Sequence, residues 1–515
     1  MAKRTLAPTN GDGRSLTTPR SVDAAVWSIC DILRRSNCAG ALQYVPELTW
    51  LLFLRILDER EQREADEAKA VGADFSPSLE SPYRWRAWAA PDGRKRKELV
   101  AGAMGAFFDF VNRDLLPHLK ALRNKPSASD RQKVISEIMS GVERTRVDTE
   151  KNLLDVLDKL DSITEKAIDP THVFPLSQVY EGLLLKMGEK GNDGGQFFTP
   201  REVIRAIVKA VDPKVGETVY DPCCGTGGFL AQAYDYMLEG LGRNATARHI
   251  GKLKRETFFG REKENLIYPI ALANLILHGV DRPNLWHGNT LTGYEQYGGL
   301  YEDAPGTFDV ILTNPPFGGK EGKEAQTNFA YKTSATQVLF LQHVIDALAN
   351  DGRCGMVVDE GVLFRTNEKA FVQTKRKLLD DCDLTCIVSL PPGVFTAAGA
   401  GVKTNLLFFT KGGPTKKVWY YDVSDIKVTK KKPFVMSHLD NFFRLLPKAG
   451  TKAADSERSW TVDRKSIEAK NFDLKAVNPN RKEAVDTRTP SELIDLIEAK
   501  GKEVSEAIAA LRATL

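Results

Sequence analysis

The sequence predicts an α/β protein with a helical N-terminal domain, a domain built on a parallel or mixed sheet with helices on both faces, and a C-terminal helix. Two observations carry this prediction. From about residue 22 to residue 168, apolar residues recur at helical spacing and strand signals are few. From about residue 175, short apolar runs alternate with helical patterns, which is typical of a covered sheet. The expected strands are residues 218–220, 257–259, 308–312, 354–358, 384–390 and 404–409, with a further one at 418–423.

The composition is that of an ordinary globular protein, with 42% hydrophobic and 27% charged residues, which excludes disordered, collagen-like and disulfide-stapled classes. A chain of 515 residues is expected to form two or three domains. Lys and Arg number 72 against 68 Asp and Glu, so the net charge neither indicates nor excludes a nucleic-acid partner. Seven cysteines without framework spacing predict reduced thiols and a cytoplasmic location. No apolar stretch is long enough to span a membrane.

The C-terminal helix has a clear start and a regular apolar stripe. Thr489 is expected to cap it, with Pro490 in the first turn and Glu492 reaching back. Packing on the core is one interpretation, but a stripe over about three heptads favours pairing with a partner helix. The stripe residues are Ile494, Ile497, Val504, Ile508, Leu511 and Leu515. The expected domains are a disordered arm (1–20), the helical domain (21–168), the catalytic domain (169–425), an irregular extension (426–487) and the C-terminal helix (488–515).

One segment of the helical domain, residues 83–88, alternates aromatic and basic residues and is followed by a basic run at 94–97. A phosphate-contacting, base-stacking edge is one interpretation. We favour a short strand or loop in which Trp85 and Trp88 pack inward, and a solvated basic run.

The first segment with chemical meaning is a glycine-rich turn. Residues 219–230 run from a strand through Gly225 and Gly227 into a helix, a geometry that lets a ligand approach the backbone closely. The spacing is not the G-x-G-x-x-G of dinucleotide sites. Asp221 could bind a cationic amine, and Glu262 at the end of the next strand could bind two ribose hydroxyls. A nucleoside with an amino-acid tail therefore fits better than a pyrophosphate.

The second segment is a strand that ends in Asn314-Pro315-Pro316-Phe317. The prolines lack N–H groups and hold the turn rigid. The Asn314 amide and the Pro315 carbonyl are then two acceptors for an –NH₂ group conjugated to a ring, and Phe317 can stack on that ring. Acceptors that strengthen as positive charge develops on the amine favour the transition state. A plain strand-terminating turn is the alternative, but the aromatic after two prolines favours the functional interpretation.

A third segment, residues 195–201, places two aromatics and a Thr-Pro helix start where they could wall a ligand pocket. Together the three segments resemble the amino-methyltransferases of DNA that use S-adenosyl-L-methionine. The resemblance is closest to the modification (M) subunit of type I restriction–modification systems and covers most of the chain. It implies a Rossmann-like methyltransferase domain and methyl transfer to the exocyclic amine of adenine.

The resemblance also implies roles for individual residues. Asn289 stands where the family often has Asp, beside the adenine of the cofactor. Residues 390–395 and 401–408 match family segments that flank the target base. The implied catalytic residues are Asn314, Pro315, Pro316 and Phe317. The implied cofactor-binding residues are Gln196, Phe197, Phe198, Thr199, Asp221, Gly225, Thr226, Gly227, Gly228, Phe229, Glu262, Asn289 and Thr290.

The implied mechanism is direct displacement. The adenine is flipped out of the duplex, and its amine attacks the sulfonium methyl in line, with no metal and no covalent enzyme intermediate. We accordingly interpret Cys223, Cys224, Cys382 and Cys386 as small buried residues, and His287 as a packing residue.

Only about a hundred residues follow position 411, which is little for reading two half-sites of DNA. Sequence choice is therefore expected to come from another chain. The resemblance supplies a specificity (S) subunit, which the C-terminal helix would dock. It also implies double-stranded DNA as substrate, a second M subunit held through the S subunit, and a restriction subunit as a further candidate member.

Other functions use the same residues. A protein-glutamine methyltransferase has the same Asn-Pro-Pro logic, but such enzymes usually have Tyr at the position of Phe317 and are shorter. An RNA amine methyltransferase and a solitary DNA modification enzyme are further candidates. An inactive scaffold with a methyltransferase fold is a candidate of another class, against which the intact Asp221, Glu262 and Asn314 argue.

Overall fold

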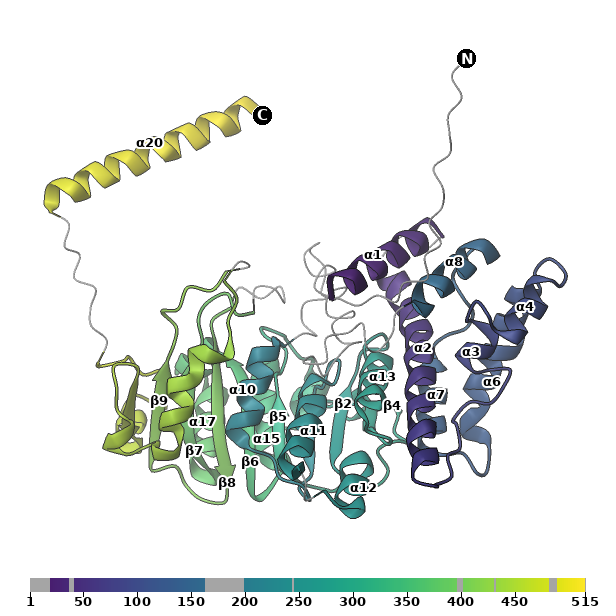
Figure 1. The fold of residues 1–515 in the computed structure, drawn as a ribbon. Coiled ribbons are helices and arrows are strands. Elements are labelled where there is room, and N and C mark those ends of the chain that lie inside the picture. Colours follow the sequence, from purple (N-terminus) through teal and green to yellow (C-terminus); the bar gives the residue numbers. More distant parts are fainter. Residues whose placement is uncertain are drawn as a thin grey trace.

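The computed structural model describes residues 19–36, 41–162, 199–242, 245–395, 402–429, 432–480 and 489–514. A helical N-terminal part lies beside a sheet domain, and the C-terminal helix α20 (Pro490–Thr514) stands away from both (Figure 1). The expected disordered arm falls almost wholly outside the described residues. Among the helices of the described ranges, none is both long and apolar enough to cross a membrane.

The N-terminal part is helical, as the apolar spacing predicts. Helix α2 is the central helix of this part, and its residues 48–57 are all buried. Ser129 and Gln132 form a reciprocal capping box at the start of α7. The Thr149 hydroxyl accepts from Asn152 N at 3.2 Å at the start of α8. The helices are α1 (Pro19–Arg35), α2 (Ala41–Ala70), α3 (Trp85–Trp88), α4 (Arg94–Val100), α5 (Ala106–Asp109), the π-helical turn Phe110–Leu115, α6 (Leu116–Ala121), α7 (Asp130–Met139) and α8 (Glu150–Asp161).

The alternating aromatic and basic segment forms the short helix α3, not the strand or loop that the sequence suggested. Trp85 and Trp88 are buried and pack edge to face, with their ring centroids 5.7 Å apart, which confirms the predicted inward packing. The basic run that follows is only partly solvated, because one turn of α4 points Arg96 toward α8. Arg96 is buried there and pairs with Asp158 at 2.6 Å.

Ten strands form one mixed sheet in the order β10-β9-β7-β8-β6-β5-β1-β2-β3-β4. The pairs β1–β2, β1–β5, β2–β3, β5–β6 and β7–β9 are parallel, and the pairs β3–β4, β6–β8, β7–β8 and β9–β10 are antiparallel. All seven strands expected from the sequence are present. The strands are β1 (Val219–Asp221), β2 (Phe258–Glu262), β3 (Asn284–Asn289), β4 (Tyr294–Tyr297), β5 (Phe308–Thr313), β6 (Leu348–Asp359), β7 (Cys382–Ser389), β8 (Thr404–Lys411), β9 (Lys417–Asp422) and β10 (Ser459–Asp463).

Three strands were not expected. β3 mixes apolar residues with Asn, His and Gly, and β4 is an exposed edge strand, so neither has an apolar run. β10 corrects the expectation of an irregular extension over 426–487, because it adds an antiparallel edge to β9. Trp460 on this strand stacks on Tyr420 of β9 at 5.4 Å, a cross-strand contact that local sequence does not reveal.

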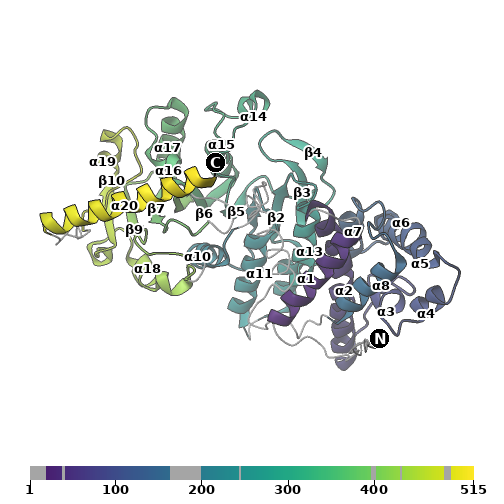
Figure 2. The ribbon, with the colours of Figure 1, turned by 90° about the horizontal axis from the view of Figure 1, so that it is seen from above.

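Helices cover both faces of the sheet, and Figure 2 shows α10, α11, α13 and α18 on one side and α14 to α17 on the other. Strands β1, β2, β5 and β6 run parallel, so their carboxyl ends meet at one edge, where ligands bind in open α/β sheets. Helix α13 also packs against α2 and α7 of the N-terminal part. The helices are α10 (Arg201–Val211), α11 (Gly228–Leu241), α12 (Ala247–Arg255), α13 (Tyr268–His278), α14 (Lys323–Thr327), α15 (Thr336–Ala347), α16 (Glu360–Phe364), α17 (Lys369–Asp381), α18 (Asp440–Leu445) and α19 (Arg464–Ala469).

Candidate active site

A cavity of about 230 Å³ opens at the carboxyl edge of the sheet. A cavity needs only about 10–15 Å³ on this measure to hold one water, so the space is large enough for an organic ligand. Three parts of the chain that the sequence analysis singled out meet here: the turns after β1 and β5, and the start of α10. The predicted site residues that line the cavity are Thr199, Asp221, Gly225, Thr226, Gly228, Phe229, Glu262, Asn289, Thr290, Asn314 and Pro316.

The glycine turn carries the chain from β1 into α11. Gly225 and Gly227 have φ of 53° and 78°, the left-handed region that favours glycine. Gly227 is the residue before the first turn of α11, so the helix begins directly behind the cavity. The carbonyl of Thr226 accepts a hydrogen bond from Asn274 Nδ2 at 2.9 Å, which ties the turn to α13.

Asp221 is the last residue of β1 and is almost fully buried. Its Oδ1 accepts from the Thr313 hydroxyl at 2.8 Å and from Cys223 N at 3.2 Å. Burial, with a smaller contribution from the charge of Glu262, raises the pKa of Asp221 to about 7. A cation beside this carboxyl would favour its charged form.

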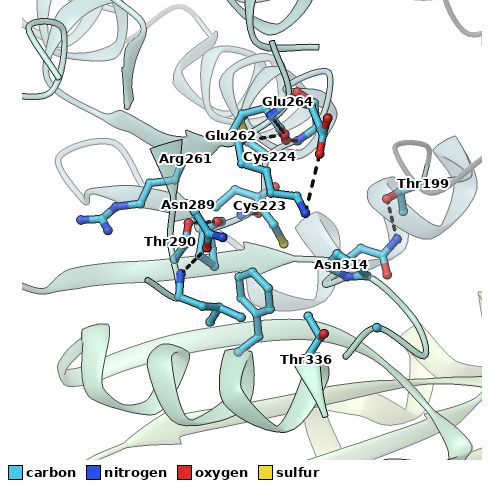
Figure 3. A pocket seen from close by; sticks show the side chains of 18 of the residues that line it. Thr199, Cys223, Cys224, Arg261, Glu262, Glu264, Asn289, Thr290, Asn314 and Thr336 are labelled. Carbon is cyan, nitrogen blue, oxygen red and sulfur yellow. Dashed lines mark hydrogen bonds and ion pairs between the residues drawn. The ribbon is translucent and has the colours of Figure 1, made fainter. Parts of the chain in front are cut away.

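Glu262 ends β2 and holds the glycine turn from the neighbouring strand (Figure 3). Its Oε2 accepts from Gly225 N at 2.9 Å, and its Oε1 accepts from Lys263 N and Glu264 N, both at 2.8 Å. Burial nevertheless raises the pKa of Glu262 to about 7. A carboxylate offers about four acceptor positions, so Glu262 retains capacity for a ligand hydroxyl.

Asn314 follows β5. The nitrogen of its side-chain amide makes a hydrogen bond, whereas the oxygen makes none with the described residues. Its Nδ2 donates to the Thr199 hydroxyl at 2.9 Å (Figure 3). Its Oδ1 is buried and has no hydrogen-bond partner among the residues that the structure describes. Buried acceptors are seldom left unpaired, so this oxygen is a candidate contact for a ligand donor.

The rest of the Asn-Pro-Pro-Phe turn is held from neighbouring elements. The Pro315 carbonyl accepts from Gln337 Nε2 at 3.1 Å. Phe317 meets Phe395 edge to face, with ring centroids 5.3 Å apart and an interplanar angle of 89°. Phe395 lies in one of the segments that the resemblance placed beside the target base, so the two segments are in contact.

Asn289 and Thr290 lie at the end of β3 and line the same cavity. Asn289 Oδ1 accepts from Leu291 N at 3.0 Å and Thr292 N at 3.3 Å, so its oxygen is used within its own turn. The Thr290 hydroxyl donates to the Pro222 carbonyl at 2.6 Å, which links this turn to the turn after β1.

Some predicted residues do not line the cavity. Gly227, Pro315 and Phe317 are not among the lining residues, although each belongs to a turn that shapes it. Gln196, Phe197 and Phe198 lie outside the described residues.

Thr313 and Gln337 also contact the site but were not predicted from the sequence. Thr313 is fully buried, and its hydroxyl joins Asp221 to the end of β5. Its position directly before Asn314 could have indicated from the sequence that Thr313 belongs to the site. Gln337 sits in α15, and nothing in its local sequence points to the turn that it contacts.

The interpretation of the four cysteines holds for Cys224, Cys382 and Cys386, which are buried. Cys223 is half-buried, lines the cavity, and has its Sγ 3.1 Å from the Thr313 hydroxyl. Burial raises the pKa of this thiol well above its usual value, so it stays protonated. His287 stacks on Tyr268 with ring centroids 4.3 Å apart, as expected of a packing residue.

Comparisons with known proteins give one consistent result. The family model described as N-6 DNA Methylase matches residues 172–488, and the model described as HsdM N-terminal domain matches residues 22–160. The methylase subunit of the type I restriction enzyme EcoEI from Escherichia coli is 34% identical over 505 residues, which cover 94% of this chain and 96% of that protein.

Two solved structures extend the likeness to three dimensions. A modification subunit of a putative type I restriction enzyme from Vibrio vulnificus has a TM-score of 0.78 at 32% identity, covering 92% of this chain and 99% of that one. A chain from a study of complex assembly and conformational transition of the type I restriction–modification system has a TM-score of 0.69 at 36% identity, covering 96% and 98%.

The fold and the site define a methylase, and the chain belongs to the N-6 DNA methylase family. Within that family it is a methylase subunit of the type I restriction–modification kind, and its reaction is the N6-methylation of adenine in DNA. This result confirms the DNA-adenine interpretation over the protein-glutamine and RNA alternatives.

Proposed function

We propose that the cavity binds S-adenosyl-L-methionine and that the turn Asn314–Phe317 presents the amine of a flipped adenine to it. The observation that carries the proposal is the Asn314 amide, whose nitrogen is held by Thr199 while its buried oxygen has no partner among the described residues. Leaving a buried acceptor unpaired costs about 1–3 kcal/mol. An amine that donates to Oδ1 removes that cost, so the oxygen is suited to the substrate.

The residues that face the cavity fit this cofactor. Burial opposes the charge of Asp221, and the ammonium group of a methionine tail would restore it. Glu262 has acceptor capacity left for one ribose hydroxyl. Asn289 uses its oxygen within its own turn, so its Nδ2 remains to donate to the cofactor's adenine ring. When bound, the cofactor supplies a methyl group on a sulfonium sulfur as the electrophile.

The chain's own residues act on the amine. Asn314 Oδ1 and the Pro315 carbonyl accept its two hydrogens and orient the nitrogen toward the cavity. Positive charge develops on that nitrogen as it attacks, so both acceptors bind the transition state more strongly than the ground state. Phe317, steadied by Phe395, stacks on the base after the base has left the duplex.

A separate specificity subunit is proposed to choose the DNA sequence and to dock on α20. The start of this helix forms as expected, with Glu492 N donating to the Thr489 hydroxyl at 3.3 Å and Thr489 N donating to Glu492 Oε2 at 2.6 Å. Ile497 and Val504 of the apolar stripe are 69% and 58% exposed. An exposed heptad stripe on a helix that stands away from the body is typical of a coiled-coil partner.

The proposed assembly places two copies of this chain on one specificity subunit and acts on double-stranded DNA. A restriction subunit is a further candidate member. The support for these partners is the exposed stripe of α20 and the likeness to methylase subunits of type I restriction enzymes.

The test is a methyl-transfer assay on the complex purified from its own host, with labelled S-adenosyl-L-methionine and unmodified DNA digested afterwards to nucleosides. We expect labelled N6-methyl-2′-deoxyadenosine, and its loss in Asn314→Ala with cofactor affinity retained. Asn478→Ala is the matched control, because the side-chain amide of this asparagine also makes hydrogen bonds, to the Glu457 carbonyl and from Asn480 N, but Asn478 does not line the cavity. Label on protein, or full activity in Asn314→Ala, would contradict the proposal.

A further inference from the structure

Gln337 connects the catalytic turn to the neighbouring strand. It is the second residue of α15 and is 3% exposed. Its Nε2 donates to the Pro315 carbonyl at 3.1 Å, and its Oε1 accepts from Asp359 N at 2.9 Å. Pro315 follows β5 and Asp359 ends β6, so one side chain joins the ends of two adjacent strands at the edge that carries the site.

We propose that Gln337 is a positioning residue for methyl transfer, which binds one lone pair of the Pro315 carbonyl and leaves the other directed at the target amine. The inference rests on the proposed function of Pro315 as an acceptor. A carbonyl oxygen has two lone pairs, so a hydrogen bond from Gln337 and one from the substrate are compatible.

The turn needs an external anchor because of its own composition. Pro315 and Pro316 have no N–H groups, so neither can donate the backbone hydrogen bond that would fix the turn from within. The amide of Gln337 supplies a donor from another element. Displacement of a reacting group by about 1 Å can cost roughly a hundredfold in rate, so an anchor on this carbonyl acts directly on the geometry of attack.

The first turn of α15 holds the segment after the catalytic turn as well. Thr336 N donates to the Gly319 carbonyl at 3.1 Å, and the Thr336 hydroxyl donates to Glu321 Oε1 at 2.9 Å. With Gln337, this turn of α15 contacts the chain at Pro315, Gly319 and Glu321. The Asn-Pro-Pro-Phe turn therefore lies between β5 and a segment fixed to the same helix end.

A purely structural role is the competing explanation, and Gln342 provides the comparison. Gln342 lies on the same helix and is 2% exposed. Its Nε2 donates to the Tyr331 carbonyl at 2.9 Å, and its Oε1 accepts from Tyr331 N at 2.9 Å. It makes the same kinds of bond at the same depth but does not contact the catalytic turn.

The experiment compares Gln337→Met, Gln337→Glu and Gln342→Met in the full complex from its own host. We measure kcat and KM for DNA methylation, the affinity for S-adenosyl-L-methionine by calorimetry, and the melting temperature. Gln337→Met is expected to lower kcat by roughly tenfold to a hundredfold. Its cofactor affinity is expected to be unchanged, and its melting temperature to match that of Gln342→Met, whose kcat is close to that of the unsubstituted complex.

Gln337→Glu adds a second measurement, a pH dependence of kcat, which a purely structural role of Gln337 would not produce. The introduced carboxyl group can donate to the Pro315 carbonyl when it is protonated, whereas its ionised form presents only acceptors and repels that carbonyl. The kcat of this variant, divided by that of the unsubstituted complex at the same pH, is therefore expected to fall as the pH rises.

A flat ratio across pH, or equal losses of kcat in Gln337→Met and Gln342→Met, would overturn the inference. If the unsubstituted complex forms no N6-methyl-2′-deoxyadenosine in DNA, the proposed function fails and the inference fails with it. The two failures are distinguishable, because failure of the proposed function appears as missing activity in the unsubstituted complex, whereas failure of the inference appears only in the comparison of the variants.

Discussion

Asn314 Nδ2 lies 2.9 Å from the Thr199 hydroxyl, and this contact joins the end of β5 to the start of α10. An amide can present either its oxygen or its nitrogen to a ligand, and the two ends have opposite hydrogen-bonding properties. With its nitrogen bound to Thr199, the Asn314 amide presents Oδ1 instead. The resemblance implies a cofactor-binding role for Thr199, and the structure shows that its hydroxyl fixes the orientation of the Asn314 amide.

This contact predicts the effect of changing Thr199. Thr199→Val keeps the shape of the side chain but removes the acceptor for Nδ2, so the amide loses its fixed orientation. We expect kcat for DNA methylation to fall by roughly tenfold to a hundredfold. Thr199→Ser retains the hydroxyl and is expected to retain most activity. The measurement is steady-state methyl transfer by the complex, and equal kcat values in the two variants would contradict the prediction.

The raised pKa of Asp221 predicts a pH dependence of cofactor binding. In the proposed site its ionised form attracts the cofactor's ammonium group, and with a pKa of about 7 the ionised fraction falls as the pH falls through neutrality. Affinity is therefore expected to be roughly tenfold weaker one pH unit below the pKa than well above it. Asp221→Asn is expected to bind more weakly above pH 7 and to show a smaller pH dependence.

Calorimetric titration of S-adenosyl-L-methionine at several pH values measures this effect. Glu264→Gln is the control, since Glu264 lines the same cavity but is not assigned to the ammonium group. A pH dependence in Asp221→Asn as steep as in the unsubstituted chain would show that another group is responsible. Glu262, whose pKa is also raised to about 7, would then be the next candidate.

The ion pairs of Arg131 are expected to hold the helical N-terminal part against the sheet domain. Its guanidinium contacts Glu61 at 3.3 Å, Glu64 at 2.8 Å and, across the boundary, Asp281 at 2.7 Å. Arg131→Met removes the cation beside the buried Glu61, while Arg60 still pairs with Glu64 and Asp281, so the expected cost is at the lower end of about 3–5 kcal/mol. Arg131→Lys recovers only part of this, because an ammonium cannot bind several carboxylates in the planar arrangement of a guanidinium.

Scanning calorimetry of the chain checks this prediction through the melting temperature. The control is Arg113→Met, since the side chain of Arg113 is 79% exposed and that of its partner Asp109 is 62% exposed. Exposed pairs of this kind contribute little to stability. A melting temperature in Arg131→Met as high as in Arg113→Met would show that the cluster does not join the two parts.

The exposed stripe of α20 predicts a variant that separates assembly from folding. Ile497→Asp combined with Val504→Asp places charges on the stripe and is expected to abolish binding of the specificity subunit. The cofactor affinity and the melting temperature of the isolated chain should not change. Glu506→Lys, on the opposite face of the helix, is the control and should bind normally.

Light scattering after co-purification measures this assembly directly. Normal assembly of the doubly charged variant would place the docking surface elsewhere. Loss of assembly in both variants would indicate a general effect of charge on α20.

Features with a local signal could be predicted from the sequence. The glycine turn, the Asn-Pro-Pro-Phe turn and the start of α20 each depend on residues within about ten positions of one another. Their conformations follow from positive φ at glycine, from the missing N–H of proline and from a capping hydroxyl. The seven apolar strand runs were found for the same reason, because burial in a sheet leaves a continuous local pattern.

Features that depend on distant neighbours became visible only in the folded chain. Strand β10 has a weak polar sequence and forms because β9 offers a free edge and Tyr420 a stacking partner for Trp460. Arg96 looked like part of a solvated run until α8 placed Asp158 beside it.

Dependence on distant residues also explains which features of the site could not be predicted from the sequence. Thr199, Asn314 and Gln337 come from separate segments, and only the packing of α10 and α15 against the end of β5 brings their polar atoms within hydrogen-bond distance. The chemistry proposed for the turn Asn314–Phe317 comes from its local residues. Its orientation comes from long-range packing, because a hydrogen bond between distant residues leaves no periodic trace in the chain.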